Sequence, residues 1–229
     1  MSRLNLGVIG AGAWGRNHVR TAAGLADAQL AAVCDADPRT RDRLARQYPG
    51  ALVTGDVGEC LAAVDAVIVA TPARTHAEIA RRAVEAGRPR LVAKPVALHG
   101  GSAGGGGRLG GGRGGARLAG HLMLFLPAVE RLRDMVERGE LGQVFYLYSL
   151  RVNLGQVRAD ENALWSFGPH DISVALYLLG ETPTRVAAQG RSYIQEGIED
   201  VVFLSMEFAS GVLAHVQMSW LDPHKERKL

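Results

Sequence analysis

The sequence predicts an α/β fold: a Rossmann-type doubly wound parallel sheet, followed by an incomplete α+β domain with a mostly antiparallel sheet. In the first half, short apolar runs alternate with helix-like segments, which is typical of βαβ units. In the second half, several strand-like runs follow one another with turn residues between them. We expect domains over residues 1–121 and 122–229.

The first strand ends at a glycine-rich turn. The apolar run Leu4–Ile9 leads into Gly10, Gly12 and Gly15, which have the spacing GxGxxG. This spacing permits a tight turn, close approach of a pyrophosphate, and packing of the next helix against the strand. The helix N-terminus adds unpaired N–H groups and the positive end of its dipole. The turn therefore predicts a dinucleotide site.

Asp35 indicates which dinucleotide binds. It follows a second buried strand, Leu30–Cys34, and lies twenty residues after Gly15. A carboxylate there accepts hydrogen bonds from both ribose hydroxyls and repels a 2′-phosphate, so the predicted cofactor is NAD. Arg39 lies close enough to leave NADP open, and a surface aspartate after a structural turn is the alternative.

The remaining elements of the first half follow in order. Asp37 with Pro38 predicts a capped helix start. We expect helices over Trp14–Leu25, Asp37–Tyr48, Val57–Ala63 and Thr75–Ala86, and strands over Ala51–Thr54, Ala66–Ala70, Arg90–Ala93 and Arg117–His121.

Several candidate residues follow strand ends, where such sheets bind ligands. Thr71 and Pro72 end the Ala66–Ala70 strand, and His76 begins the next helix, either facing the cofactor or serving a structural role. Lys94 follows the Arg90–Ala93 strand and either points toward a nicotinamide or is solvated.

The segment Gly100–Gly115 interrupts the pattern, because eleven of its sixteen residues are glycine. Glycine costs about 1 kcal/mol per helical position relative to alanine, so no stable helix is expected. The segment is either a flexible linker or the product of a local frame shift.

The second half contains two predicted helices and several strands. We expect helices over Pro127–Arg138 and from the first turn at His170 onward, entered through Gly168-Pro169, and strands over Gln143–Asn153, Thr184–Ser192, Val201–Phe208 and Val212–Trp220. His170 suits a general base, or else caps its helix. Arg151 and Asn153 are candidates for binding a sugar or carboxylate, or else solubilise an edge strand.

Charge, hydropathy and cysteine content bear on whether the protein binds nucleic acid, enters a membrane or holds a metal. The net charge is only +3 and the arginines are scattered, which does not suggest nucleic-acid binding. No apolar run is long enough to span a bilayer and no signal-peptide pattern is present, so a cytoplasmic protein is expected. Cys34 and Cys60 are expected to be inert core thiols, and no metal site is predicted.

Four features together resemble the glucose-fructose oxidoreductase and inositol dehydrogenase (Gfo/Idh/MocA) family of NAD(P)-dependent sugar dehydrogenases: GAGAWGxNH, Asp35, ATPxxxH and Lys94-Pro95. The resemblance implies that Ala13 and Trp14 contact the cofactor with the glycines, and that Lys94 contacts cofactor and substrate and assists proton transfer. The family has glutamate where this chain has Ala93. The family also has a catalytic histidine at the position of His170, and it has an aspartate where this chain has Ser166.

The stretch NLGxVRxxENALWSFGPHDIS is similar to the branch that acts on nucleotide-linked sugars, such as UDP-N-acetylglucosamine-uronate 3-dehydrogenases. The similarity implies a sugar or nucleotide-sugar substrate, for which Arg151, Asn153 and Ser166 are the candidate contacts. Because open sheets of this family commonly associate through their faces, a homo-oligomer is expected as well. The family usually continues further, so we expect the second domain to be truncated. A catalytically impaired dinucleotide-binding remnant is the main alternative, and a dinucleotide sensor is a third.

Overall fold

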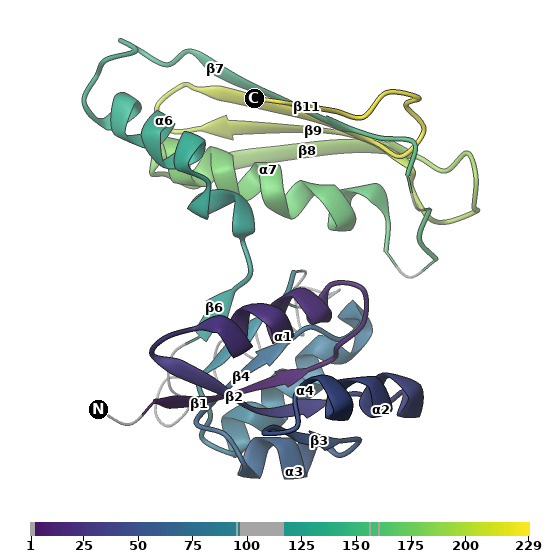
Figure 1. Ribbon diagram of the computed structural model, residues 1–229. Helices are drawn as coiled ribbons and strands as arrows, with labels where there is room; N and C mark the ends of the chain where they lie inside the picture. Colours follow the sequence, from purple (N-terminus) through teal and green to yellow (C-terminus); the bar gives the residue numbers. More distant parts are fainter. Residues whose placement is uncertain (1–2, 95, 97–116, 156, 160) are drawn as a thin grey trace. The chain divides into compact units, whose positions relative to one another are not determined.

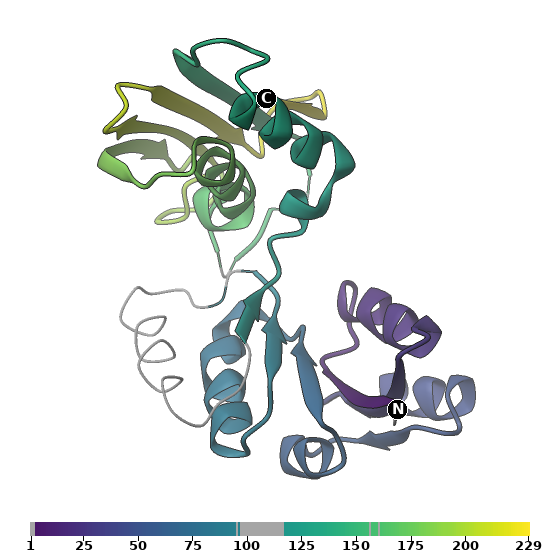
Figure 2. The same ribbon diagram turned by 90° about the vertical axis from the view of Figure 1, so that its left-hand side faces the viewer.

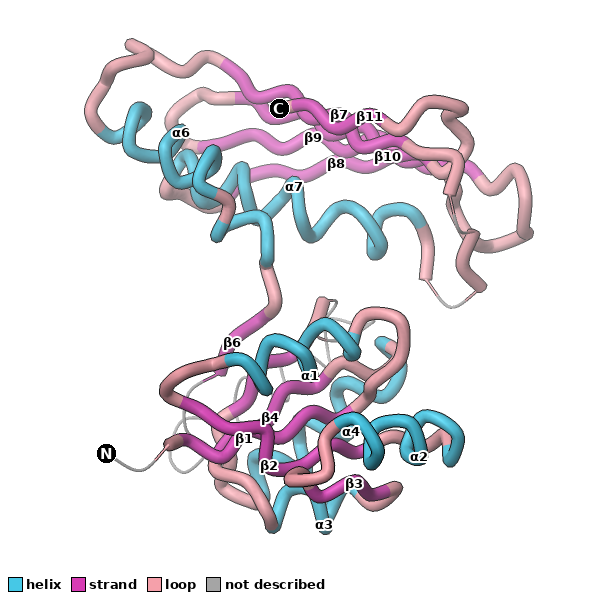
Figure 3. The backbone as a smooth tube through the Cα atoms, in the orientation of Figure 1, coloured by secondary structure: helices cyan, strands magenta, loops and turns pink. Residues whose placement is uncertain are grey.

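The short apolar runs of the sequence form strands in two separate sheets (Figure 3). The structure is a computed structural model that describes residues 3–94, 96, 117–155, 157–159 and 161–229. The chain divides into two units, Met1–Gly120 and His121–Leu229. Pro95 and the tract Gly100–Gly115 lie outside the described residues.

In the described part of the first unit, six parallel strands form one sheet in the order β3-β2-β1-β4-β5-β6 (Figure 1). The strands are β1 (Leu4–Ile9), β2 (Ala28–Cys34), β3 (Leu52–Thr54), β4 (Ala66–Val69), β5 (Arg90–Val92) and β6 (Arg117–Ala119). From β1 the chain adds β2 and β3 on one side, and it then adds β4, β5 and β6 on the other side, so the order of the strands reverses between β1 and β4. In doubly wound sheets this switch point is where ligands bind, and the glycine-rich turn follows β1.

Helices cover both faces of this sheet (Figure 2). They are α1 (Gly15–Gly24), α2 (Pro38–Gln47), α3 (Val57–Ala62) and α4 (Ala73–Glu85). Val19 of α1 and Leu44 of α2 share one core with β1 and β2. Cys60 of α3 and Ile79 of α4 belong to the core on the other face. The predicted doubly wound fold is confirmed.

An aspartate caps the start of α2, as the sequence predicts. The Asp37 carboxylate accepts hydrogen bonds from the N–H groups of Arg39 (3.2 Å) and Thr40 (3.1 Å), and Pro38 occupies the first turn. These bonds satisfy donors that a helix start otherwise leaves unpaired.

Both cysteines are free and buried, as predicted. Burial raises the pKa of the Cys34 thiol to about 11 and that of Cys60 to about 12. Both therefore stay protonated at neutral pH and behave as small apolar side chains.

The second unit contains a mixed sheet with helices on one face. Its helical elements are η1 (Leu122–Phe125), α6 (Pro127–Glu137) and α7 (Ala163–Leu179). Its strands are β7 (Tyr146–Val152), β8 (Pro183–Arg191), β9 (Val201–Phe208), β10 (Leu213–Ser219) and β11 (Glu226–Lys228), in the order β11-β7-β10-β9-β8. β7 and β10 are parallel, and the other pairs are antiparallel. The short strand β11 was not expected from the sequence.

The long helix α7 begins earlier than predicted. Asn162 caps it by accepting a hydrogen bond from the Trp165 N–H (3.0 Å), and Pro169 lies inside the helix. Gly168 fits closely on the sheet, because a Cβ there would lie 3.3 Å from the Met218 sulfur. Burial of the segment before Pro169 compensates for the hydrogen bond that proline cannot donate. The prediction that His170 and Asp171 occupy the first turn was therefore wrong.

The two faces of the second sheet differ. The face under α7 is apolar and buried, with Met206, Val216 and Trp220 in its core. On the opposite face, the His215 ring stacks on Tyr148 of β7 and Phe203 of β9, with ring centroids 6.1 and 6.3 Å apart. Tyr148 and Phe203 are each 41% exposed. An aromatic row therefore crosses three neighbouring strands on the open face.

Candidate functional site

The turn after β1 is built so that only glycine fits at two positions. Gly10 has φ +90°, and a Cβ there would lie 2.7 Å from the Thr71 backbone nitrogen. A Cβ on Gly15 would lie 1.9 Å from the carbonyl oxygen of Gly10. Around Gly12, in contrast, nothing lies within 4 Å of the Cβ position. The turn thus packs tightly on the sheet at Gly10 and Gly15 and leaves its backbone open at Gly12.

Asp35 is held at the end of β2, beside this turn. Its Oδ2 accepts a hydrogen bond from the Ala11 N–H (2.7 Å), and its Oδ1 accepts one from the Asp37 N–H (2.9 Å). Each carboxylate oxygen can accept a further bond. The open backbone at Gly12, the start of α1 and this fixed carboxylate fit a dinucleotide, with the pyrophosphate at the turn and ribose hydroxyls at Asp35.

Trp14 and Ala13 are exposed next to Gly12. The Trp14 ring meets the His18 ring edge-on, with centroids 6.4 Å apart. Burial lowers the pKa of His18, which favours a neutral imidazole at neutral pH. This pair shapes the surface beside the turn.

The turn after β4 is stabilised by its own side chains. A ring nitrogen of His76 lies 2.7 Å from the Thr71 carbonyl oxygen, and the imidazole is 1% exposed. The Thr75 hydroxyl donates to either the Thr71 hydroxyl or the Pro72 carbonyl, each 2.8 Å away. His76 therefore fixes the shape of the Thr71-Pro72 turn from inside.

Lys94 lies two residues after the end of β5, at the same carboxyl edge of the sheet as Thr71. The pairing of β4 and β5 continues past the strands, because the Ala93 N–H donates to the Val69 carbonyl (2.8 Å). Lys94 is partly buried there. Its backbone position is thus fixed by the neighbouring strand.

In the second unit, Ser166 and His170 lie four residues apart within α7, and therefore on one face of that helix. Ser166 is 4% exposed, and His170 is partly exposed. Asn153 follows β7, where its backbone N–H donates to the Ser219 carbonyl (3.0 Å).

The next residue on α7, Asp171, is the centre of a buried polar network that the sequence did not reveal. Arg151 donates to it through Nε (2.5 Å, to Oδ2) and Nη2 (3.0 Å, to Oδ1). The Ser149 hydroxyl lies 2.7 Å from Oδ1 and 3.2 Å from the Lys228 carbonyl. The Arg151 and Asp171 side chains are 8% and 7% exposed. The structure thus places the Arg151 guanidinium against α7, where it ties the helix segment after His170 to β7.

The part of the chain that the structure describes contains neither a membrane-spanning helix nor a metal-binding cluster. None of the helices there has the length and apolar character that crossing a bilayer requires. No group of three or more His, Cys, Asp and Glu side chains is arranged there to hold a metal ion.

Two family models match the sequence. The model described as "Oxidoreductase family, NAD-binding Rossmann fold" matches residues 4–104. The model described as "GFO/IDH/MocA C-terminal domain" matches residues 129–229.

Known proteins are similar over nearly the whole chain. Inositol 2-dehydrogenase 2 of Saccharopolyspora erythraea is 33% identical over 227 residues, which are 94% of this chain and 66% of that protein. The chain thus spans just under two thirds of that relative.

Solved structures also share the fold. GenD2 from gentamicin A biosynthesis, in complex with NAD, has a TM-score of 0.90 and 29% identity over 99% of this chain and 68% of its own. UDP-N-acetylglucosamine 3-dehydrogenase GnnA from Acidithiobacillus ferrooxidans has a TM-score of 0.88 and 28% identity over 99% of this chain and 73% of its own.

The contact between Gly15 and Gly10 gives a stability prediction. Gly15→Ala is expected to destabilise the first unit by about 2–4 kcal/mol, because the added Cβ cannot fit against the Gly10 carbonyl. Urea unfolding followed by circular dichroism measures this. Gly24→Ala, at the other end of α1 with nothing within 4 Å of its Cβ, is the control and should change stability by less than about 1 kcal/mol. Equal effects of the two substitutions would contradict the assigned packing.

The buried network gives a second prediction. Arg151→Met is expected to destabilise the second unit by about 3–5 kcal/mol, because it leaves the Asp171 carboxylate buried without its cation. The double variant Arg151→Met/Asp171→Leu should recover most of that loss. Arg185→Met is the control: it removes an exposed ion pair with Glu207 and should lower the free energy of unfolding by less than about 1 kcal/mol. Urea unfolding followed by tryptophan fluorescence compares the three, and a double variant no more stable than the single one argues against the network.

Proposed function

Since this chain belongs to the Gfo/Idh/MocA family of NAD-binding oxidoreductases, we propose that it catalyses hydride transfer between NAD and a carbinol carbon of a nucleotide-linked sugar. The turn at Gly10–Gly15 and the fixed Asp35 carboxylate are the observations that carry the proposal. Bound NAD supplies the hydride acceptor. The protein binds the substrate, orients it and removes its hydroxyl proton.

The proton must leave as the carbonyl forms. When the C–H bond breaks with its electron pair, the O–H bond breaks as well, and its proton passes to a base. The Lys94 amine and the His170 imidazole are the two proposed bases. The backbone before Lys94 is fixed beside β4. His170 lies on α7 directly before Asp171, which is hydrogen-bonded to Arg151.

The cofactor contacts are proposed for the residues around the switch point of the first sheet. They are Gly10, Gly12, Ala13, Trp14, Gly15, Asp35, Thr71, Pro72, His76 and Lys94. Because the His76 ring bonds to the Thr71 carbonyl, its contribution is to shape the turn that meets the cofactor.

The substrate contacts are proposed for Asn153 and Ser166. Arg151 was a third candidate, but its Nε and Nη2 groups both donate hydrogen bonds to the Asp171 carboxylate. Its proposed role is therefore to position α7. A nucleotide-linked sugar is favoured over a free polyol by the sequence NLGxVRxxENALWSFGPHDIS, and the similarity to GnnA supports it.

A second candidate function is dinucleotide binding without turnover. Ala93 and Ser166 stand where the family has a glutamate and an aspartate, so both proposed bases have lost a carboxylate neighbour. Without these neighbours the two bases are less well oriented and tuned.

One experiment separates the two candidates. NAD binding is measured first by isothermal titration calorimetry, and NADH formation is then followed at 340 nm with UDP-N-acetylglucosamine, its uronate and myo-inositol. We expect NAD to bind and a UDP-linked sugar to be oxidised at least about tenfold faster than myo-inositol. Lys94→Met and His170→Ala should each lower kcat by about 10²–10⁴-fold while NAD still binds.

The outcomes are distinct. NAD binding without turnover in a folded sample assigns the chain to the binding-only function. Faster turnover of myo-inositol overturns the nucleotide-sugar assignment but not the dehydrogenase. His224→Ala, at an exposed position in the turn after β10, is the matched control for His170→Ala and should leave kcat unchanged.

We also propose that the chain forms a homo-oligomer through the open face of the second sheet. The aromatic row Tyr148, His215 and Phe203 lies on that face, with 71% exposed Tyr146 and 55% exposed Leu213 on the same strands. Contiguous exposed apolar surface of this kind is typical of interaction sites.

Sedimentation velocity tests this assembly. Phe203→Lys places a charge in the aromatic row and is expected to convert the oligomer to monomer, because an unpaired charge is costly to bury. Val186→Lys, at an exposed position on β8 that faces the helix side of the sheet, is the control and should leave the assembly intact. A monomeric parent protein, or dissociation of both variants alike, overturns the proposed interface.

A further inference from the structure

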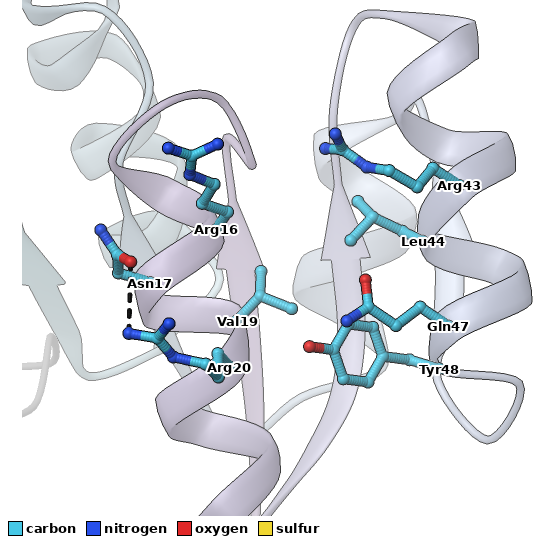
Figure 4. Close-up of a pocket in the computed structure, with 8 residues that line it drawn as sticks. All are labelled: Arg16, Asn17, Val19, Arg20, Arg43, Leu44, Gln47 and Tyr48. Carbon is cyan, nitrogen blue, oxygen red and sulfur yellow. Dashed lines mark hydrogen bonds between the residues drawn. The ribbon is translucent and has the colours of Figure 1, made fainter.

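A groove between α1 and α2 contains an unusual set of polar side chains (Figure 4). Its volume is about 250 Å³, and it is lined by Arg16, Asn17, Val19, Arg20, Arg43, Leu44, Gln47 and Tyr48. Val19 and Leu44 point toward each other at its centre, and both are buried in the core. The groove therefore has an apolar floor with polar groups around it.

Three arginines, Arg16, Arg20 and Arg43, are among the residues that line the groove. In Figure 4, Arg43 reaches from α2 toward α1, and the Arg16 head lies at the same end of the groove. Arg20 lies on the α1 side, within 3.4 Å of the Asn17 amide oxygen. The Tyr48 hydroxyl points from α2 toward α1. The groove thus offers charged donors from both helices and a phenol that can donate or accept.

None of these three arginines forms an ion pair with a carboxylate in the part of the chain that the structure describes. Elsewhere in the chain, Arg81 and Arg133 are paired with glutamates on their own helices. The two helices that form the groove carry six arginines and a single acidic residue, Asp42. The positive charge at the groove is therefore not neutralised by the surrounding helices.

From this arrangement we propose that the groove is a binding site for a small phosphorylated molecule, of the size of a sugar phosphate. A phosphate monoester carries almost two negative charges and three acceptor oxygens at neutral pH, which matches several guanidinium groups. The Asn17 and Gln47 amides and the Tyr48 hydroxyl can hydrogen-bond to hydroxyl groups of the attached sugar. The volume of about 250 Å³ fits a small molecule.

This site is separate from the proposed cofactor site. The lining contains none of Gly10, Gly12 and Asp35, and it comes from α1 and the α2 segment, which pack on one side of the sheet. The proposal does not depend on whether the chain is an active dehydrogenase.

Calorimetric titration of the full chain with glucose 6-phosphate tests the proposal. Saturating NAD is present so that the glycine turn is not available to the phosphate. We expect one molecule to bind per chain, and Arg20→Gln and Arg43→Gln each to weaken binding by at least about tenfold, the loss expected for one charge-assisted hydrogen bond. Arg46→Gln is the matched control, because Arg46 is an exposed arginine of α2 that does not line the groove.

Three results would overturn the proposal. One is the absence of binding at millimolar glucose 6-phosphate. Another is an equal loss in the Arg46→Gln control, which would indicate attraction to general positive charge. The third comes from a parallel titration with NADP. If Arg20→Gln and Arg43→Gln weaken the binding of NADP but not the binding of glucose 6-phosphate, these arginines serve the adenosine end of the dinucleotide. Inorganic phosphate is titrated as well, and weaker binding than glucose 6-phosphate is expected because it lacks the sugar hydroxyls.

Discussion

The first unit depends on a close backbone contact between Gly15 and Gly10. The carbonyl of Gly10 occupies the space that any Cβ at position 15 would need. This contact places α1 directly against the end of β1, so that the first N–H groups of the helix, the open backbone at Gly12 and the Asp35 carboxylate lie together. The dinucleotide site is therefore a consequence of how a helix packs on a strand.

In the second unit, a buried charge fixes the position of a helix on the sheet. Asp171 is held by a two-point bond from Arg151 and by Ser149, all with little exposure to water. Burying such a pair contributes little net stability, but its geometry is specific. It fixes α7 to β7 one residue after His170, so the position of that histidine depends on a strand about twenty residues earlier.

Much of this architecture could be predicted from local patterns. The glycine spacing, Asp37-Pro38 and the apolar runs are local signals, and they gave the strands and helices of the first unit with small errors at their ends. The start of α7 was missed because Gly168-Pro169 is locally a helix-breaking signal, and only the packing on Met218 and the Asn162 cap overcome it. The pairing of Arg151 with Asp171 could not be predicted, because it joins residues twenty positions apart on different elements. The strand β11 has no apolar pattern of its own and forms by pairing with β7.

The parallel pairing of β7 with β10 has a consequence for how the second unit folds. Tyr146 pairs with Leu213, and the chain between them forms α7, β8 and β9. Closing so long a loop costs conformational entropy before any contact compensates for it, and non-local pairings of this kind slow folding. During synthesis on the ribosome, β7 emerges well before either of its partners, β10 and β11, exists. Until they are made, both edges of β7 lack the partners that they have in the folded sheet, and unpaired strand edges favour aggregation and chaperone binding.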